Sequence, residues 1–336
     1  MTTSAEHAVS RAMTPIRNAV ASGAIPGAVL AVATADSKAI RSAGYAIITP
    51  AVELLADDTW FDLASLTKVM FTTPAVLRLI DAGRLTLDDK LGDIFRELES
   101  PVRNLTVREC LGHCTWLPAH VPLHLVGLES EALTKWILSH AWEMGPCVYS
   151  DINFIILGLM VERLTGQRLA AMPLPPGLSF SPDPHRCAAT EYCTWRQRSL
   201  RGEVHDENAA VLGGAAGHAG LFGTASGVID FARSILTGAG WSSTSLNSMR
   251  APQRATRTLG WELRHEGWPG GDAASNGAIG HNGFTGTGLW IDFERGVTWT
   301  LLTNRVHPSR SRPTGIGDLR RIVGDLVVKS IDEGHF

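Results

Sequence analysis

The chain has 336 residues, of which 44% are hydrophobic and 19% are charged, and its formal net charge is −3. This balance is typical of globular proteins, and the lack of a long basic cluster argues against a nucleic-acid-binding protein. Because one hydrophobic core rarely exceeds roughly 250–300 residues, we expect one large domain with an insertion, or two domains.

The first part of the chain has four segments with the patterns of regular structure. They are a helix at 14–20, a β-hairpin at 25–45, a helix at 69–83 and a turn at 85–89. Pro15 suits the first turn of the first helix, where a proline leaves no hydrogen bond unmade. Pro74 lies inside the second helical pattern, so it should kink or split that helix.

Helices are predicted in the middle of the chain and strands again near its end. The expected helices are 106–111, 129–140, 151–164, 224–236 and 317–329, and the expected strands are 288–293 and 297–304. Residues 172–194 carry five prolines and are expected to form a long loop. This order predicts an α/β (α+β) fold, with a sheet domain formed by 1–70 and 210–336, a helical insertion at 71–209 and the active site between them.

The most informative motif is Ser65-Leu66-Thr67-Lys68, a Ser-x-x-Lys spacing that occurs once in the chain. On a helix, residues three apart lie on one face, so the Ser65 hydroxyl and the Lys68 amine can come within hydrogen-bond reach. A serine hydroxyl becomes a good nucleophile when a neighbouring base takes its proton. A buried lysine can lose its own proton and act as that base, whereas an arginine cannot.

Residues 1–7 lack a basic region followed by an apolar core, and no stretch has the roughly 20 apolar residues that span a bilayer. We therefore expect no membrane segment and a cytoplasmic location. The five cysteines are an odd number, which predicts free thiols in a reducing compartment.

One cluster of cysteines and histidines could suggest a zinc site: Cys110, His113, Cys114, His120 and His124. The spacing lacks a second matching pair of ligands, and cysteines are often simply buried. We therefore predict no metal and no other cofactor.

Two further motifs accompany Ser65 and Lys68. Tyr149-Ser150-Asp151-Ile152-Asn153-Phe154 precedes a predicted helix, and residues 280–286 (Gly-His-Asn-Gly-Phe-Thr-Gly) precede a predicted strand. The three motifs, in this order, resemble those of the serine β-lactamase and penicillin-binding-protein superfamily. The tyrosine in the second motif resembles the class C branch, which also holds family VIII carboxylesterases and D-amino-acid-peptide hydrolases.

The resemblance extends over nearly the whole chain. Residues 25–28 resemble the first strand of that superfamily, and residues 83–89 resemble the turn after its nucleophile helix. Residues 202–209 and 217–225 resemble a subgroup that includes a penicillin-binding protein 4B type. The implied fold is the β-lactamase/transpeptidase-like one: an antiparallel sheet flanked by helices, with an inserted, mostly helical domain.

The resemblance also implies a set of catalytic roles. Ser65 would be acylated, and Lys68 and Tyr149 would share the role of base, with Tyr149 returning a proton to the leaving group. The backbone N–H groups of Ser65 and Phe284 would form the oxyanion hole, where preorganised donors contribute about 10²–10³ in rate.

Two residues depart from the family pattern. Asp151 replaces the usual asparagine, so an ionised carboxylate that only accepts hydrogen bonds stands where an amide would donate to a substrate carbonyl. His281 replaces the lysine that helps β-lactamases hold the substrate carboxylate. Both changes disfavour β-lactams and favour esters or small amides.

Several residues are expected at the substrate cleft, most of them from the resemblance and His218 because it lies in a loop with glycine neighbours. Besides Asp151 and His281, they are Asn282, Gly283, Trp116 and His218, of which Trp116 would narrow the cleft. His205, Asp206 and His218 also suggest a Ser–His–Asp triad, but the chain lacks the Gly-x-Ser-x-Gly nucleophile elbow of such enzymes. We therefore assign His218 to the cleft and predict no triad.

The leading functional prediction is a serine hydrolase that forms an acyl-enzyme on Ser65 and hydrolyses small esters. One alternative is a D-alanyl peptidase or β-lactamase that acts on amide bonds. A second alternative is a catalytically silent binding protein of the same fold, since a fold alone does not fix function. The intact set of Ser65, Lys68 and Tyr149 argues against the silent protein. The expected partner is a small-molecule ester or amide substrate.

Overall fold

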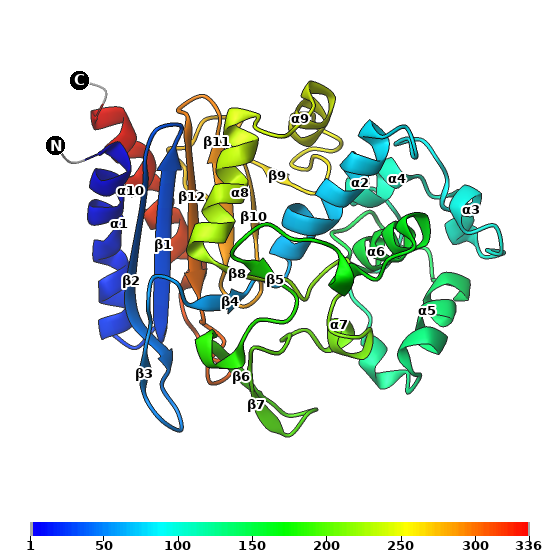
Figure 1. Cartoon of the computed structure of the whole chain (residues 1–336), viewed down its shortest axis with the longest axis horizontal. Helices are drawn as coiled ribbons and strands as arrows, with labels where there is room; N and C mark the ends of the chain where they lie inside the picture. Colours follow the sequence, from blue (N-terminus) through cyan, green and yellow to red (C-terminus); the bar gives the residue numbers. More distant parts are fainter. Residues whose placement is uncertain (1–2, 335–336) are drawn as a thin grey trace.

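The structure is a computed structural model that describes residues 3–334. Within this range, seven antiparallel strands form the main sheet in the order β3-β2-β1-β12-β11-β10-β9 (Figure 1). Their bounds are β1 Gly27–Thr34, β2 Lys38–Ile47, β3 Glu53–Leu54, β9 Glu262–Leu263, β10 Ile279–Asn282, β11 Gly288–Asp292 and β12 Val297–Thr303. The predicted antiparallel sheet is therefore confirmed. Residues 1, 2, 335 and 336, which the predicted sheet domain includes, lie outside the described range.

Strands from the two ends of the chain meet at the centre of this sheet. β1 pairs with β12 along its length, from Ala28 opposite Thr303 to Thr34 opposite Val297. Helices α1 (Ser4–Ala21) and α10 (Ile316–Glu333) cover one face, and α8 (Ala225–Thr237) covers the other (Figure 1). Because successive side chains of a strand point to opposite faces, β1 contributes alternately to two apolar cores and is buried on both sides.

Helix α1 begins ten residues before the predicted start. Thr3 accepts a hydrogen bond from the Glu6 backbone N–H, and the Glu6 carboxylate accepts one from the Thr3 N–H, which is a capping box. Three of the first four buried positions of this helix are alanines (Ala5, Ala8 and Ala12, with Val9), whose small side chains give a weak apolar pattern in the sequence.

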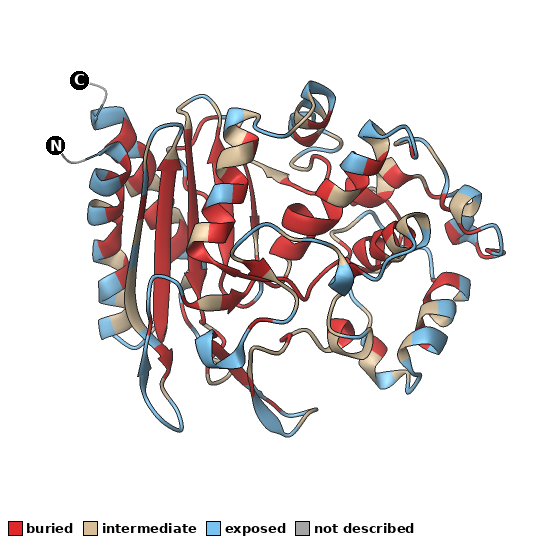
Figure 2. Ribbon diagram, in the orientation of Figure 1, coloured by how far each residue is buried: buried red, intermediate tan, exposed pale blue. Residues whose placement is uncertain are grey.

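The other half of the molecule is mainly helical. Its helices are α2 Thr73–Asp81, α3 Leu91–Ile94, α4 Val107–Leu111, α5 Ser130–Ser139, α6 Asp151–Thr165 and α7 Glu207–Val211, with α9 (Ser243–Arg250) beside α2. Helix α6 is buried over most of its surface (Figure 2), as its long apolar run predicts. The predicted helices at 106–111, 129–140 and 151–164 are confirmed.

The predicted break at Pro74 takes the form of a π-helical turn over Lys68–Thr72, directly before α2. Proline has no backbone N–H, so Pro74 cannot bond to the carbonyl four residues earlier, and a wider turn joins the two segments. This turn carries Lys68 at its first position, so the break lies next to the predicted catalytic serine.

The predicted long loop at 172–194 is wrong in part, because it contains two strands. β5 (Leu178–Ser179) pairs with β8 (Phe222–Thr224), which also pairs with β4 (Trp60–Asp62). β6 (Ala189–Cys193) forms a hairpin with β7 (Arg198–Arg201). Three of the five prolines precede β5, and the other two lie between β5 and β6. The division of the chain at 71–209 stays a prediction.

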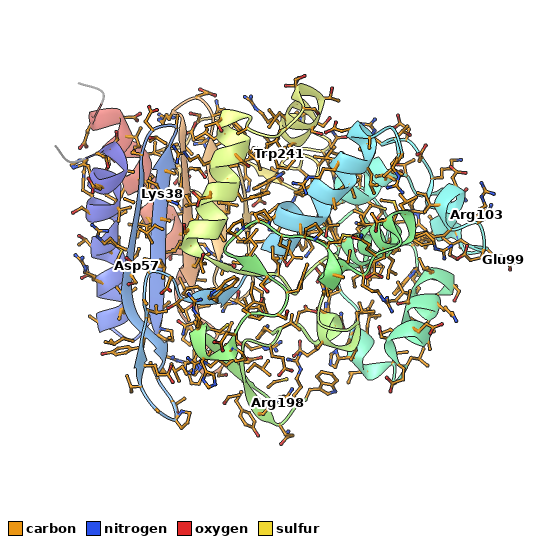
Figure 3. The ribbon with its side chains drawn as sticks, viewed as in Figure 1. Lys38, Asp57, Glu99, Arg103, Arg198 and Trp241 are labelled. Carbon is orange, nitrogen blue, oxygen red and sulfur yellow. The ribbon has the colours of Figure 1, made fainter. Side chains whose placement is uncertain are left out.

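Side chains link the layers across the molecule (Figure 3). The Lys38 ammonium on β2 lies 2.8 Å from the Asp230 carboxylate on α8. Trp241, which follows α8, packs edge-to-face on Phe231, and the Arg78 guanidinium of α2 lies 6.0 Å from its ring. The sheet and the helical half are therefore joined by direct contacts.

No helix within residues 3–334 is long and apolar enough to cross a membrane. All five cysteines are free thiols, as predicted. In the same range, no three His, Cys, Asp or Glu side chains are grouped so that they could hold a metal ion.

Candidate active site

Ser65 and Lys68 lie where the chain leaves β4 and enters the π-helical turn. The Lys68 Nζ is 2.9 Å from the Ser65 Oγ, as the spacing of the two residues predicts. The lysine side chain is completely buried, and its Nζ also donates to the backbone carbonyl of His218 at 3.1 Å. The sequence motif therefore forms a real contact inside the protein.

A glycine permits the close packing that holds this lysine. Gly217 lies against α6, where a Cβ atom would come within 1.9 Å of the Phe154 carbonyl oxygen. The Gly217 carbonyl accepts a hydrogen bond from the Thr72 hydroxyl at 2.6 Å. These contacts bring the next residue, His218, close enough for its carbonyl to meet Lys68.

Asp151, the first residue of α6, forms an ion pair with Lys68, with 2.8 Å between its Oδ1 and the lysine Nζ. Its Oδ2 lies 3.5 Å from the His120 Nδ1. Burial would raise the pKa of Asp151, but the Lys68 charge and the His120 hydrogen bond hold that pKa well below its usual value. Asp151 does line the substrate pocket, but its charge is compensated by Lys68 and is not free to repel an anionic substrate.

The same pair determines the charge of Lys68. Burial alone would lower the lysine pKa, but the Asp151 carboxylate and the Tyr149 hydroxyl outweigh burial and raise it. Lys68 is therefore an ammonium in the resting enzyme. The expectation that a desolvated Lys68 gives up its proton readily does not fit this geometry.

Tyr149 is held in place by aromatic and cationic neighbours. Its ring lies 4.4 Å from the His113 ring and 5.7 Å from the His281 ring, measured between centroids. The Lys68 Nζ and the Arg257 guanidinium each lie 5.1 Å from the tyrosine ring centre. Two cations thus lie against the tyrosine ring, where their charges favour negative charge on Tyr149.

His113 orients the segment that carries Tyr149. Its Nδ1 accepts a hydrogen bond from the Ser150 backbone N–H at 3.1 Å. Burial and the nearby Lys68 charge lower the pKa of His113 well below its usual value, so the ring is neutral. In the sequence His113 suggested only a metal ligand, and nothing there indicated its contact with the second motif.

The third motif is attached to the Ser65 loop by side-chain hydrogen bonds. The Thr285 hydroxyl donates to the Asp62 carbonyl at 2.7 Å, and the Thr287 hydroxyl donates to the Leu63 carbonyl at 3.1 Å. A Cβ on Gly283 would come within 2.6 Å of the Leu63 carbonyl, so this close approach requires glycine. Among the described residues, the backbone N–H groups of Ser65 and Phe284 have no acceptor, which suits the predicted oxyanion hole.

His281, on β10, is a buried neutral imidazole. Its Nδ1 lies 2.9 Å from the carbonyl oxygen of Asn282, which can only accept, so the ring proton is on Nδ1. Burial, with the charges of Arg257 and Lys68, lowers the pKa of His281 well below its usual value. His281 therefore supplies no positive charge to this part of the site, as the sequence predicts.

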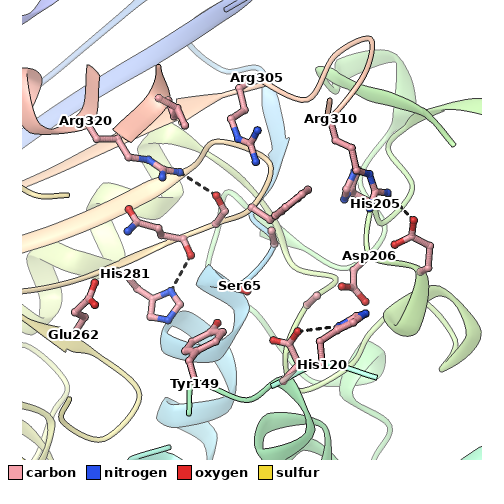
Figure 4. A pocket seen from close by; sticks show the side chains of 18 of the residues that line it. Ser65, His120, Tyr149, His205, Asp206, Glu262, His281, Arg305, Arg310 and Arg320 are labelled. Carbon is pink, nitrogen blue, oxygen red and sulfur yellow. Dashed lines mark hydrogen bonds and ion pairs between the residues drawn. The ribbon is translucent and has the colours of Figure 1, made fainter. Parts of the chain in front are cut away.

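The motifs open into a pocket of about 630 Å³ that includes Ser65, Tyr149, Asp151, His281 and the segment Asn282–Phe284 (Figure 4). Trp116 is not among the residues that line it; this side chain packs on the apolar core of the helical half. His218 is fully buried, and its Nε2 lies 2.9 Å from the Asp206 Oδ1. The structure thus gives no support for a place of Trp116 or His218 in the cleft.

The histidines near the pocket do not form a triad with Ser65. The His205 Nε2 lies 3.0 Å from the Glu191 carboxylate, and His218 pairs with Asp206. The Ser65 hydroxyl instead contacts Lys68. The prediction that no Ser–His–Asp triad is present agrees with these contacts.

Four arginines line the pocket, and sequence reasoning missed them: Arg257, Arg305, Arg310 and Arg320. Arg257 pairs with Glu262 at 3.2 Å, and Arg310 pairs with Glu191 and Glu207. Arg305 and Arg320 have no carboxylate within ion-pair distance in residues 3–334. The run Asn304–Arg312 after the last strand, which holds three arginines, was the one signal for this charge in the sequence.

The two arginines without acidic partners lie close to the third motif. The Arg305 guanidinium lies 4.8 Å from the Phe284 ring centre. Arg320 is buried and donates to the carbonyls of Gly283 at 3.0 Å and Thr287 at 2.6 Å. Burial, with a contribution from Arg305, lowers the pKa of Arg320 to about 9. These groups give the upper wall of the pocket in Figure 4 a positive charge.

A sequence profile of the Beta-lactamase family matches residues 14–321, a range that includes all three motifs. The chain belongs to the β-lactamase family. It is therefore a serine hydrolase of that family, and the predicted kind of enzyme is confirmed.

Two curated relatives act on amide bonds according to their names. An N-acetylmuramyl-L-alanine amidase of Bacillus subtilis is 31% identical over 87% of this chain and 80% of its own length. A putative D-alanyl-D-alanine carboxypeptidase of Escherichia coli is 29% identical over 76% of this chain and 71% of its own length.

Solved structures share the fold. EstCE1, a hydrolase with promiscuous acyltransferase activity, superposes with a TM-score of 0.75 at 19% identity, covering 96% of this chain and 99% of its own. A class C β-lactamase from Rhodobacter sphaeroides gives a TM-score of 0.71 at 19% identity, covering 95% of this chain and 99% of its own. These similarities confirm the predicted β-lactamase/transpeptidase-like fold.

Proposed function

We propose that this family member hydrolyses an amide bond in a substrate that carries a carboxylate, through an acyl-enzyme on Ser65. The class of substrate is that named for the Bacillus subtilis relative, in which an acyl group is joined to the nitrogen of L-alanine. This proposal revises the sequence-based preference for small esters.

The observation that carries the proposal is the pair Arg305 and Arg320. Both guanidinium groups line the pocket, and neither has a carboxylate partner among the described residues. A guanidinium matches a carboxylate with two parallel hydrogen bonds, and such charge-assisted bonds are stronger than neutral ones. An anionic substrate would supply the missing partner, whereas a short neutral ester would leave both charges unmatched.

The reaction uses the groups around Ser65. Tyr149 reacts as a phenolate: as the Ser65 Oγ forms a bond to the substrate carbonyl carbon, its proton passes to the phenolate oxygen, and the Ser65 and Phe284 N–H groups bind the carbonyl oxygen. Tyr149 then gives a proton to the leaving nitrogen as the C–N bond breaks. A water molecule hydrolyses the acyl-enzyme by the same proton transfers in reverse order.

Small esters remain the second candidate, because position 281 of the third motif supplies no cation. Its neutral imidazole replaces the cation that β-lactamases place in the third motif. An ester without a carboxylate would not need that cation, so it would lose nothing by the replacement.

The test compares four substrates by kcat/KM with purified protein. They are N-acetylmuramyl-L-alanine, its alanine methyl ester, p-nitrophenyl butyrate and nitrocefin. We expect the free acid to exceed its methyl ester by about 10–150-fold, which corresponds to one charged hydrogen bond. Equal values for the acid and its methyl ester would overturn the carboxylate assignment, and cleavage of p-nitrophenyl butyrate alone would favour the ester candidate. Ser65→Ala is the control for contaminating activity.

A further inference from the structure

The imidazole of His281, a residue of the pocket wall, has a buried hydrogen-bond acceptor that no protein group uses. Only 5% of the residue is exposed, yet its side chain lines the cavity beside Tyr149 (Figure 4). The Nδ1 proton is donated to the Asn282 carbonyl at 2.9 Å. Because the ring is neutral, the Nε2 atom carries a lone pair and no proton.

The Nε2 atom has no hydrogen-bond partner among residues 3–334. Leaving a buried polar atom without a partner costs about 1–3 kcal/mol, so such an atom in a pocket marks a place where a ligand can supply the partner. Because Nε2 can only accept, the ligand group must be an N–H or an O–H. A carboxylate cannot fill this role.

The His281 ring lies on the side of the site where the leaving group is expected. Tyr149, whose ring centre lies 5.7 Å from that of His281, is the proposed donor of a proton to the leaving atom. The leaving atom must therefore come close to both side chains. In an amide that atom is a nitrogen with a hydrogen of its own, whereas in an ester it is an oxygen without one.

We propose that His281 accepts a hydrogen bond from the N–H of the scissile amide and thereby selects amides over esters. This inference deepens the proposed function and rests on it. With the N–H directed to His281, the lone pair that develops on nitrogen in the tetrahedral intermediate faces Tyr149. The Tyr149 O–H bond then breaks, an N–H bond forms, the C–N bond breaks, and the amine leaves neutral.

The experiment uses three substrates that share the same acyl group and differ in the leaving group. They are N-acetylmuramyl-L-alanine, the analogue in which L-lactate replaces L-alanine so that oxygen replaces N–H, and the N-methyl-L-alanine amide. All three keep the carboxylate. The measured quantity is the ratio of kcat/KM for the amide to kcat/KM for the lactate ester, in the wild type and in two variants.

His281→Lys replaces the acceptor with a group that only donates, and His281→Gln retains an acceptor oxygen. We expect the amide-to-ester ratio to fall about 5–100-fold in His281→Lys and to be largely kept in His281→Gln. A third measurement uses the wild type alone. Because the N-methyl amide lacks the N–H, it should be cleaved at least about fivefold more slowly than the parent amide.

The outcomes separate this inference from the proposed function. If the wild type cleaves the amide but His281→Lys lowers kcat/KM equally for the amide and the lactate ester, His281 has only a structural role. The inference then fails, while the proposed function stands. If the wild type cleaves the lactate ester and not the amide, both proposals fail. A selective loss of amide cleavage in His281→Lys that His281→Gln restores would establish the role of His281.

Discussion

The ammonium of Lys68 and the carboxylate of Asp151 lie 2.8 Å apart in the interior of the active site. The family resemblance predicts asparagine at position 151, so the ion pair distinguishes this chain from the family pattern. Tyr149, His113 and His281 surround Lys68, and His120, His218 and Asp206 surround Asp151. Asp151 is the one carboxylate within residues 3–334 that contacts Lys68.

Asp151→Asn should release the proton of Lys68 at a lower pH. Without the carboxylate, burial favours the neutral amine, so the lysine pKa should fall below that of the wild type. The chain has five lysines, so ¹³C labelling at lysine Cε gives a spectrum simple enough to assign with a Lys68 variant. Glu207→Gln, which removes another pocket carboxylate without touching Lys68, is the matched control. An unchanged Lys68 titration in Asp151→Asn would contradict the electrostatic account.

The same pair should contribute a constant amount of stability near neutral pH. The Asp151 pKa is depressed, so its contribution is lost only in strong acid, and the Lys68 pKa is raised, so its contribution is lost only in strong base. Removing one partner of a buried pair costs about 3–5 kcal/mol. Urea unfolding at pH 6 should show Asp151→Asn less stable than the wild type by about this amount, and the gap should narrow as rising pH removes the Lys68 proton in the variant. Equal stabilities at pH 6 would refute the ion pair.

Arg305→Gln should weaken binding of carboxylate-bearing substrates selectively. Arg305 lines the pocket without an acidic partner, so its removal costs the substrate one charged hydrogen bond. We expect KM for N-acetylmuramyl-L-alanine to rise by about 10–150-fold, with little change for its methyl ester. The methyl ester serves as the control within each protein. Equal effects on both substrates would mean that Arg305 acts on the structure of the pocket and not on the carboxylate.

Lys68→Ala and Tyr149→Phe should show non-additive losses. If both residues serve one proton transfer, each substitution removes about 10²–10⁴ of kcat/KM, and the double variant loses little more. The losses are measured as steady-state kcat/KM on two substrates. One is the amide, and the other is p-nitrophenyl butyrate, an ester whose leaving group needs no protonation. Additive losses would show that the two residues act in separate steps.

Gly217→Ala should destabilise the protein, since a methyl group there would lie 1.9 Å from the Phe154 carbonyl oxygen. Forced overpacking of this kind costs about 1–3 kcal/mol or more. Gly317→Ala is the control, because a Cβ at that helical position meets no atom within 4 Å and alanine favours the helix. Thermal melts should show a lower Tm for the first variant and an equal or higher Tm for the second.

Local patterns predicted much of this structure. The Ser65–Lys68 contact spans one helical turn, and α6, β11 and β12 each come from a short local run of residues. The Lys68–Asp151 pair could not be predicted in the same way, because it joins residues 83 positions apart that meet only when α6 packs on the π-helical turn. The free charges of Arg305 and Arg320 depend on which acids fold beside Arg257 and Arg310. Of the two strands within 172–194, β5 pairs with the distant β8 and β6 pairs with β7 beyond the end of the predicted loop, so the local proline content misled the prediction.

The central claim is that Ser65 carries the acyl group of a cleaved amide. Intact-protein mass spectrometry of enzyme quenched during turnover of N-acetylmuramyl-L-alanine tests it most directly. We expect a mass increase equal to the substrate minus L-alanine, on the peptide that contains Ser65, and no adduct in Ser65→Ala. An adduct on another residue, or turnover that persists in Ser65→Ala, would contradict the account.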